Sequence, residues 1–382
     1  MPESLRIAVI SRVFSRSGGG AESYSVALVK QLVARHDIHV FSQESDHPVE
    51  GVGYHPVFML SRKPRWVNQL LFAIATWLKT RRGFDVVHSH ENTWHGQIQT
   101  IHVRPIRSNL FIPYRGFGLA LRWLKVALSP RLITYVVLEG ARFELKPDRR
   151  TVATSDSLRI ECEQAYPFCA GKIAVIAPGT DLPAQSIDRL TARTLLQLPL
   201  AGHLVLFVAN DYAKKGLDAL LAAMARLDAD VGLAVVGKPG AMPKYVQRAA
   251  QLGLTARVHF LGALDGLSPA YWAADCLAHP TLEDSFAMVV LEAMAHGLPV
   301  VVSAPPYCGI SNSLIHGDEA LLLNDPNNAA DLSRLIASLL HEPSVAEHLR
   351  VKGHAFAGRH SWENAALQYE ALYQEVGAAR IP

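Results

Sequence analysis

Two carboxylates in the second half of the chain, Asp284 and Glu292, have a spacing that could do chemistry. They stand eight residues apart, after an apolar stretch over Cys276–His279 and around the start of a helical pattern over Val289–His296. We therefore expect Asp284 in a loop that enters a helix, with Glu292 about one turn inside it. Ionised carboxylates accept hydrogen bonds from sugar or ribose hydroxyl groups, although an ordinary acidic first turn of a helix would show the same spacing. Backbone N–H groups at the start of the helix could bind phosphate oxygens; they belong to Ala287, Met288 and Val289.

Two adjacent lysines, Lys214 and Lys215, stand at a second turn of the same kind. They follow the apolar stretch His203–Ala209 and precede a helical pattern over Leu217–Leu227. Lysine forms strong charge-assisted hydrogen bonds with phosphate, so the pair could neutralise a diphosphate. A solvated Lys-Lys-Gly turn is the alternative.

A third turn contains three consecutive glycines, Gly18, Gly19 and Gly20, with Glu22 at the start of the following helical pattern. Glycines let a backbone approach a ligand closely, and a helix N-terminus offers free N–H groups to an anion. The loop does not match the G-x-G-x-x-G pattern of nicotinamide dehydrogenases, and the chain has no G-x-x-x-x-G-K-[ST] phosphate loop. A flexible turn is the alternative, since an acid in the first helical turn is favourable whatever the function.

These turns belong to two successive series of short apolar stretches that alternate with helical patterns. Such a chain is expected to form an α/β protein of two doubly wound, Rossmann-like domains. We place them at residues 1–182 and 183–362, and a last helix over 363–382 could pack on either domain. Parallel sheets bind ligands beyond the carboxyl ends of their strands, so a cleft between the domains is the expected site. The expected strands are Ile7–Ile10, Ile38–Phe41, Val86–Val87, Val152–Thr154, Ile173–Ala177, His203–Ala209, Gly232–Val236, Val258–Leu261, Cys276–His279 and Pro299–Ser303.

The overall composition excludes a disordered chain and a strongly basic nucleic-acid binder. Of 382 residues, 49% are hydrophobic, and 37 Lys+Arg against 34 Asp+Glu give a net charge of only +3. Residues 1–185 nevertheless carry +8 and the remainder −5, which suggests different partners for the two halves. The four cysteines form no C-x-x-C pair, the apolar N-terminal stretch is too short for a signal peptide, and no stretch approaches a membrane span. We expect a reduced, cytoplasmic chain.

Most of the positive charge lies between residues 60 and 131, which hold 12 Lys+Arg and two acids, with aromatic residues interleaved. The stretch Arg115–Lys125 suits a helix that lies in a membrane interface. An anionic membrane surface or a phosphorylated glycolipid acceptor is the favoured partner. Single-stranded nucleic acid and a merely solvated face are the alternatives, and we expect no nucleic-acid partner.

A group of histidines, His88, His90, His95 and His102, stands in the same half of the chain. His88 and His90 would share one face of a strand, but no acidic or cysteine partner stands at a zinc spacing. Metal binding, contact with a donor or acceptor, and a purely structural role stay open, and we expect no metal.

The string from Ala278 to Pro299 resembles the E-x7-E signature of the family 4 retaining glycosyltransferases, which have the GT-B fold. Within that family the likeness is closest to glucosyltransferases of the lipopolysaccharide core. Four further turns resemble family motifs: Gly18–Glu22 the GG-A-E loop, Ala177–Asp181 the P-N-G-V-D turn, Lys214–Gly216 the R/K-K-G turn, and Gly262 the F-x-G turn.

The resemblance implies a role for each matching residue. The three glycines would approach the donor diphosphate, Lys214 and Lys215 would bind it and stabilise the leaving nucleotide, and Gly262 would pack against the base. Glu292 would hold the ribose and Asp284 the transferred sugar, near His102, which matches the family's T-x-H histidine. Asp284 replaces the usual Glu, so Glu283 is an alternative, and Ala209-Asn210 replaces the common Gly-Arg. Glu22 and His90 are candidates for further sugar or acceptor contacts.

The resemblance also implies an activity without a cofactor or metal. The expected reaction moves a hexose, glucose from UDP-glucose, to a lipopolysaccharide core or another lipid-linked saccharide, with retention at the anomeric carbon. The enzyme would then be peripheral on the cytoplasmic face of the inner membrane. A sugar-nucleotide epimerase and a non-catalytic nucleotide-sugar binder are the rival interpretations.

Overall fold

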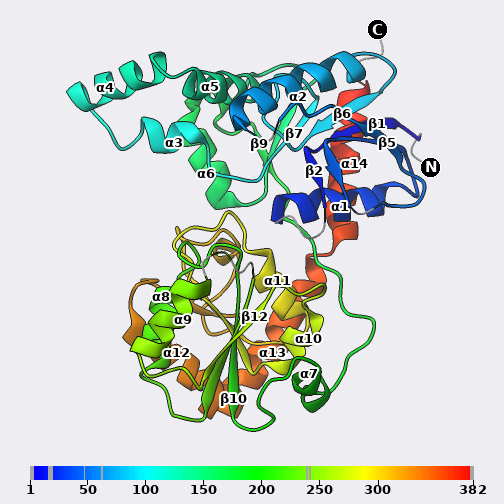
Figure 1. The fold of residues 1–382 in the computed structure, drawn as a ribbon. Coiled ribbons are helices and arrows are strands. Elements are labelled where there is room, and N and C mark those ends of the chain that lie inside the picture. Colours follow the sequence, from blue (N-terminus) through cyan, green and yellow to red (C-terminus); the bar gives the residue numbers. More distant parts are fainter. Residues whose placement is uncertain are drawn as a thin grey trace. The chain divides into compact units, whose positions relative to one another are not determined.

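The chain folds into two α/β units, which we describe separately from a computed structural model (Figure 1). The structure describes residues 4–15, 20–46, 48–61, 63–237, 240 and 242–378. The N-terminal unit contains residues 1–178 and, after the other unit, residues 362–382; the C-terminal unit contains residues 179–361. From the sequence we expected boundaries at 182/183 and 362/363.

The N-terminal unit is built on a parallel sheet of seven strands in the order β5-β3-β1-β6-β7-β8-β9. The central strands are buried along their whole length, as expected for a parallel sheet covered on both faces. The strands are β1 (Arg6–Ile10), β3 (Asp37–Ser42), β5 (Gly53–Pro56), β6 (Val86–Ser89), β7 (Ile98–Ile101), β8 (Arg150–Ala153) and β9 (Ile173–Val175), with β2 (Val13–Phe14) and β4 (Glu44–Ser45) in a separate pair. The helices are α1 (Gly20–Leu32), α2 (Arg65–Thr80), α3 (Ile106–Leu110), α4 (Gly116–Ala127), α5 (Pro130–Arg142), α6 (Asp156–Ala165), the 3-10 turn η1 (Pro167–Cys169) and α14 (Trp362–Ala378).

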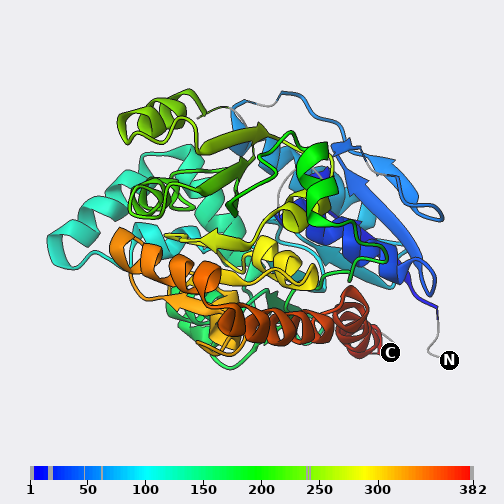
Figure 2. The same ribbon diagram turned by 90° about the horizontal axis from the view of Figure 1, so that it is seen from below.

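The C-terminal unit has a parallel sheet of six strands in the order β12-β11-β10-β13-β14-β15. Helices cover both faces, with α8, α9 and α12 on one side and α10, α11 and α13 on the other (Figures 1 and 2). The strands are β10 (His203–Val208), β11 (Val231–Val236), β12 (Val258–Gly262), β13 (Cys276–His279), β14 (Val300–Ser303) and β15 (Leu321–Leu323). The helices are α7 (Arg189–Leu195), α8 (Leu217–Met224), α9 (Met242–Gln251), α10 (Ser268–Ala273), α11 (Met288–Ala295), α12 (Ala329–His341), α13 (Pro343–Arg359) and the 3-10 turn η3 (Ile310–Ser313).

Helix α14 packs on the N-terminal unit against α1. The hydroxyl of Tyr24 on α1 donates to the hydroxyl of Tyr369 on α14 at 2.9 Å, and Tyr369 in turn lies 2.8 Å from the Thr100 hydroxyl of β7. Tyr373 is also fully buried. The last helix of the chain therefore contributes to the core of the first unit.

Candidate functional site

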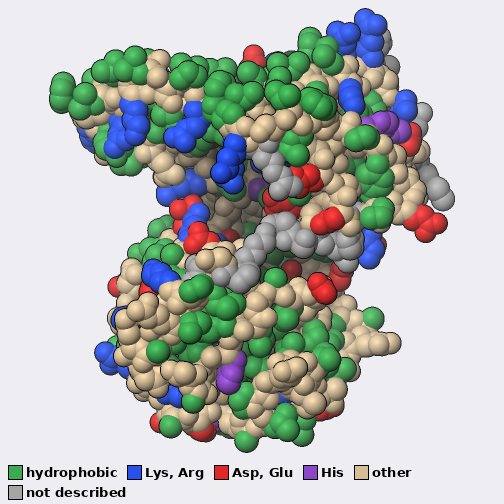
Figure 3. All heavy atoms as spheres, in the orientation of Figure 1, with side chains coloured by type: hydrophobic (Ala, Val, Ile, Leu, Met, Phe, Trp, Pro, Cys, Tyr) green, Lys and Arg blue, Asp and Glu red, His purple; other side chains and the backbone are tan. Residues whose placement is uncertain are grey.

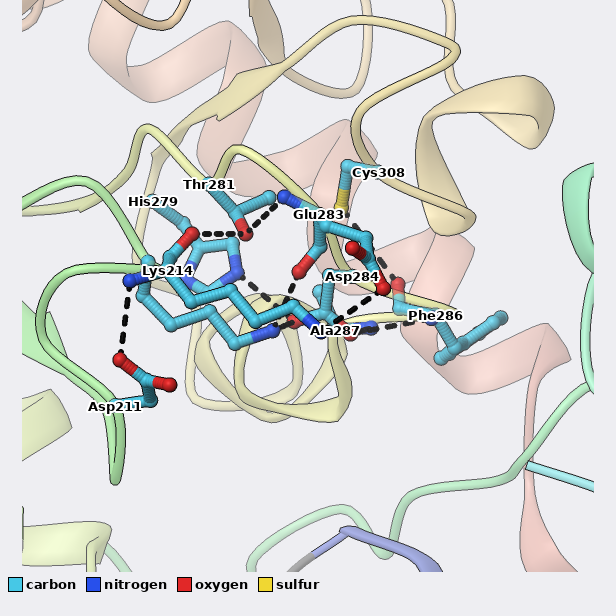
Figure 4. Close-up of polar contacts among 10 residues, drawn as sticks. Asp211, Lys214, His279, Thr281, Glu283, Asp284, Phe286, Ala287 and Cys308 are labelled. Atoms are coloured by element: carbon cyan, nitrogen blue, oxygen red, sulfur yellow. Dashed lines mark hydrogen bonds and ion pairs between the residues drawn. The ribbon is translucent and has the colours of Figure 1, made fainter. Parts of the chain in front are cut away.

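The candidate site of the C-terminal unit forms where β10 and β13 end. These neighbouring strands are parallel, so the turns that follow them meet at the same edge of the sheet. The Nζ atom of Lys214 lies 2.9 Å from Oε1 of Glu283, and Nζ of Lys215 lies 2.6 Å from Oδ2 of Asp284. Figure 4 shows the Lys214 side chain extended toward Glu283. The structure thus brings the predicted lysine pair and the predicted acids together.

Asp284 is the centre of this cluster and its carboxylate is fully engaged. Oδ1 accepts the backbone N–H groups of Phe286 at 3.2 Å and Ala287 at 2.9 Å, while Oδ2 lies 3.1 Å from Nε2 of His279 in addition to the Lys215 contact. Burial by itself would raise the pKa of Asp284, but the His279 hydrogen bond and the Lys215 charge outweigh it and hold that pKa well below its usual value. Asp284 therefore stays ionised and orients Lys215.

The two ion pairs differ in exposure. The Lys215 and Asp284 side chains are 20% and 17% exposed, whereas those of Lys214 and Glu283 are 45% and 42% exposed. The two side chains of an exposed ion pair separate readily and can then contact water or a ligand. Glu283 therefore presents the more accessible carboxylate and Asp284 the more fixed one.

The Lys-Lys-Gly turn requires its glycine. Gly216 has a φ of +83°, and a Cβ atom there would stand 1.9 Å from the carbonyl oxygen of Pro280. The two turns are also joined by a hydrogen bond from the Leu282 N–H to the Lys214 carbonyl at 2.9 Å. This close approach is what places the lysines beside the carboxylates.

Replacing Gly216 with alanine should therefore destabilise the C-terminal unit. The left-handed conformation alone costs about 1–2 kcal/mol for a residue with a Cβ atom, and the contact with Pro280 adds to it, so we expect a loss of at least about 2 kcal/mol. Thermal unfolding measures the effect. Gly266→Ala is the matched control, because nothing lies within 4 Å of its Cβ position. Equal melting temperatures for the two variants would contradict this account of the turn.

Helix α11 begins at Met288, as the sequence predicted within one residue, but the Ala287 N–H group is not free. We expected the N–H groups of Ala287, Met288 and Val289 to face phosphate oxygens. This was wrong for Ala287, because its left-handed conformation, with a φ of 72°, turns its N–H group to the Asp284 carboxylate. Within the described residues, the N–H groups of Met288 and Val289 have no acceptor. They remain the donors that a ligand could use.

Glu292 lies one turn inside α11, as expected. Its Oε2 atom accepts the hydroxyl of Tyr271 on α10 at 2.8 Å. Burial raises the pKa of Glu292 above its usual value, although the Tyr271 hydrogen bond acts in the opposite direction. Tyr271 thus fixes one carboxylate oxygen and leaves the other to a ligand.

Two other turns were predicted to contact the sugar donor, the one at Gly262 and the glycine loop, and the structure describes the second only in part. Gly262 ends β12 with a φ of +72° and nothing within 4 Å of a Cβ position. Gly18 and Gly19 lie outside the described residues. Gly20 is the first residue of α1, and Glu22 lies in the first turn of that helix.

Three of the four predicted histidines, His88, His90 and His102, gather at the carboxyl ends of β6 and β7, whereas the His95 ring packs against Trp94. Nδ1 of His90 lies 2.9 Å from Nε2 of His102, while His88 bonds Tyr373 and Thr100 at 2.7 Å each. Burial, helped by the Arg142 charge, lowers the pKa of His90 to about 3. These imidazoles are therefore neutral at physiological pH, and His102 is partly exposed. In the described part of the chain, no three or more His, Cys, Asp or Glu side chains are arranged so that they could hold a metal ion.

Sequence reasoning missed several residues of these sites. His279 was read only as the end of a strand, and its signal was its position five residues before Asp284. Tyr271 carried no signal, because its hydroxyl meets Glu292 only through the packing of α10 on α11. Tyr24, Tyr369 and Tyr373 were read as helix positions, and only the fold shows that their hydroxyls join the histidine group.

Two family models match the chain, one in each half. The model described as Glycosyltransferase Family 4 matches residues 18–183, and the model described as Glycosyl transferases group 1 matches residues 202–342. Together with the two parallel-sheet units, these matches define the GT-B fold. Residues 18–183 match family 4, the family that the motifs resembled.

Solved structures agree on the fold. WaaG, a glycosyltransferase involved in lipopolysaccharide biosynthesis, has a TM-score of 0.81 at 20% identity, covering 95% of this chain and 98% of that one. HepE from Anabaena in complex with UDP-glucose has a TM-score of 0.74 at 18% identity, covering 97% and 100%. At these identities the likeness concerns the fold alone. It does not extend to the narrower expectation of a lipopolysaccharide core glucosyltransferase.

Curated relatives carry a different name. The D-inositol 3-phosphate glycosyltransferase of Corynebacterium urealyticum is 32% identical over 244 residues, which are 59% of this chain and 56% of the relative. The one from Mycobacterium leprae is 34% identical over 255 residues, covering 60% and 55%. The chain thus spans about half the length of the curated relatives it matches.

Proposed function

We propose that the protein is a retaining hexosyltransferase that uses a nucleotide diphosphate sugar, with UDP-glucose as the first donor to test. The observation that carries the proposal is the cluster of Lys214, Lys215, Glu283 and Asp284 beside the open N-terminus of α11. Cations and unpaired N–H groups at one edge of a parallel sheet suit a diphosphate. Glu292 suits the ribose hydroxyls of the same ligand.

We assign different tasks to the two acids of the cluster. As the donor breaks down, negative charge develops on the leaving diphosphate, and Lys215, held in place by Asp284, stabilises it without having to reorient. Glu283 can leave Lys214 to accept a hydroxyl of the transferred sugar. We therefore assign the sugar-facing carboxylate to Glu283 and a positioning role to Asp284, which revises the role implied by the resemblance.

Retention follows from attack on the face that the nucleotide leaves. Retaining hydrolases use a carboxylate nucleophile, but in the described site Asp284 is held by Lys215, His279 and backbone N–H groups, and Glu283 is assigned to a sugar hydroxyl. We propose that the departing phosphate oxygen takes the proton of the acceptor hydroxyl. The partly exposed, neutral His102, with His90 behind it, can accept or donate a hydrogen bond to the sugar or the acceptor, and Glu22 is a further contact.

The acceptor is proposed to be a phosphorylated saccharide or glycolipid, including the lipopolysaccharide core. The basic character of residues 60–131 supports an anionic acceptor. The curated relatives are named for a phosphorylated polyol, D-inositol 3-phosphate, which agrees with an acceptor of this class.

Transfer is tested by incubating the protein with UDP-glucose, with and without a phosphorylated glycolipid acceptor. The proposal expects UDP release and a glycosylated acceptor with retained anomeric configuration, read by NMR. A new sugar nucleotide formed from the donor alone would instead identify an epimerase. Nucleotide binding without sugar transfer to any acceptor would contradict the proposal and identify a non-catalytic nucleotide-sugar binding protein.

The described residues contain no helix long and apolar enough to cross a membrane. Helices α2, α4 and α5 nevertheless expose large apolar side chains, and Figure 3 shows hydrophobic side chains gathered over this part of the N-terminal unit. On α4 the exposed ones are Phe117, Leu121, Trp123 and Leu124. Together with Arg122 and Lys125, these side chains suit the interface of an anionic membrane.

Membrane docking gives a direct prediction. Full-length protein should float with vesicles of phosphatidylglycerol and phosphatidylcholine, less so at high salt because salt screens the basic side chains. Phe117→Ser with Leu124→Ser should lower partitioning at least about tenfold, since each buried apolar side chain contributes about 1.5–3 kcal/mol. Leu190→Ser with Leu195→Ser, on exposed positions of α7, is the control. Equal flotation of both double variants would contradict docking through α4.

A further inference from the structure

A separate cavity lies in the N-terminal unit between the first turns of α2 and α5. Its volume is about 680 Å³, and it is lined by Lys63, Pro64, Arg65, Trp66, Arg131 and Tyr135. Lys63 to Trp66 form the entry into α2, while Arg131 and Tyr135 stand in the first two turns of α5. None of these residues belongs to the donor cluster or to the histidine group.

The cavity has an unbalanced positive charge. The described residues of its lining include three cations and no acid. In the described part of the chain, Lys63, Arg65 and Arg131 form no ion pair. Helices α2 and α5 contain one acid, Glu139, and its carboxylate already accepts two backbone N–H groups of α3 and the Tyr166 hydroxyl. Among the described residues, no acid of the lining or of helices α2 and α5 is therefore available to neutralise the three cations.

The topology puts the cavity at the edge of the sheet where ligands bind. Helix α2 leaves the carboxyl end of β5, and α5 leads back to the amino end of β8. In a parallel sheet such helices run antiparallel to the strands, so their N-termini lie at the carboxyl edge. His90 and His102 follow the carboxyl ends of β6 and β7, at the same edge of the same sheet.

We propose that this cavity is an anion subsite that binds a phosphate group carried by the acceptor. Arginine forms bidentate hydrogen bonds with phosphate, and lysine adds a point charge. The rings of Trp66 and Tyr135 offer apolar faces for the saccharide or lipid that carries the phosphate. The subsite would select phosphorylated over neutral acceptors. This inference deepens the proposed function. The identification of the ligand as an acceptor rests on that function, whereas the existence of an anion site does not.

The subsite is tested by calorimetric titration of the full chain with glucose 6-phosphate, inorganic phosphate and neutral glucose, and with dihexanoyl phosphatidylglycerol below its micelle concentration. Wild-type protein should bind the phosphorylated probes and not glucose. Arg65→Gln with Arg131→Gln should weaken phosphate binding at least tenfold and leave UDP binding, which reports on the C-terminal unit, unchanged. Lys30→Gln, an exposed cation on α1, is the matched charge control and should bind like wild type.

The outcomes show whether the phosphate belongs to a saccharide or to a lipid, and they test the anion subsite separately from the transferase activity. Arginine-dependent binding of glucose 6-phosphate supports a phosphorylated saccharide, and arginine-dependent binding of the phosphatidylglycerol alone supports a lipid headgroup. Undiminished binding in the double variant, an equal loss in Lys30→Gln, or no binding of any phosphate overturns the subsite. Arginine-dependent binding in a protein that transfers no hexose would keep the anion site and reject the transferase.

Discussion

Replacing Lys215 with methionine should lower the rate of hexose transfer by about 10²–10³-fold, the loss that follows removal of one preorganised donor from a developing negative charge. Lys215 is held 2.6 Å from Asp284 and also donates to the Glu283 carbonyl at 3.0 Å. Its ammonium group is therefore fixed before the donor binds. Methionine keeps the length and apolar contacts of the side chain and removes only the charge.

The fold should survive this change well enough for the rate to be measured. Asp284 keeps the hydrogen bonds from His279 and from two backbone N–H groups. Lys352→Met is the control, since this exposed lysine lies 3.6 Å from Asp318 on the same unit. Initial rates at saturating UDP-glucose and circular dichroism of each variant make the comparison. A Lys215 variant as active as the control would remove Lys215 from the mechanism.

Replacing Glu292 with glutamine should weaken nucleotide binding without lowering the stability of the fold. Loss of charged hydrogen bonds to the ribose, each about 1.5–3 kcal/mol, should weaken binding of UDP by about 10²-fold. The same change should leave the protein as stable or more stable at neutral pH, because Gln keeps a partner for Tyr271 and removes a charge that burial disfavours.

The effect of Glu292→Gln on stability should depend on pH in a direction set by the pKa shift of Glu292. The folded state raises the pKa of Glu292 above its ordinary value of 4.5, so the folded protein binds this proton more tightly than the unfolded chain. Stability from this group is therefore lost as pH rises from about 4.5 through the folded pKa. The melting temperature of Glu292→Gln relative to wild type should rise over that window and stay level above it. A Glu347→Gln control should show no such gain, since Glu347 is exposed and paired with Arg350. A fall in relative stability with rising pH would contradict the assignment.

The sequence predicted most of the second sheet because its strands are uninterrupted apolar stretches. Cys276–His279 was predicted to the residue. Strand β7 was not predicted as a strand, since its buried Gln99 and Thr100 interrupt the apolar pattern. Their polar groups are satisfied by distant partners, Arg142 on α5 and Tyr369 on α14, which no local pattern reveals.

The candidate site shows the same limit at the level of single atoms. Motif spacing brought Lys215, Asp284 and Glu292 into one site. It could not show that the carboxylate oxygens of Asp284 accept hydrogen bonds from His279 and from backbone N–H groups, one of which belongs to Ala287. These contacts depend on the tight turn at Gly216 and on the left-handed conformation of Ala287, which arise only from tertiary packing.

The central claim is that a nucleotide diphosphate sugar binds between the Lys-Lys-Gly turn and the start of α11. Amide hydrogen exchange of the full chain, with and without UDP-glucose, tests it most directly. The N–H groups of Met288 and Val289 have no acceptor among the described residues and are the donors proposed for the diphosphate. The account predicts slowed exchange in peptides covering residues 211–217 and 283–292 in wild type, and little slowing in Lys215→Met. Saturating UDP-glucose that leaves exchange in both segments unchanged would contradict the account.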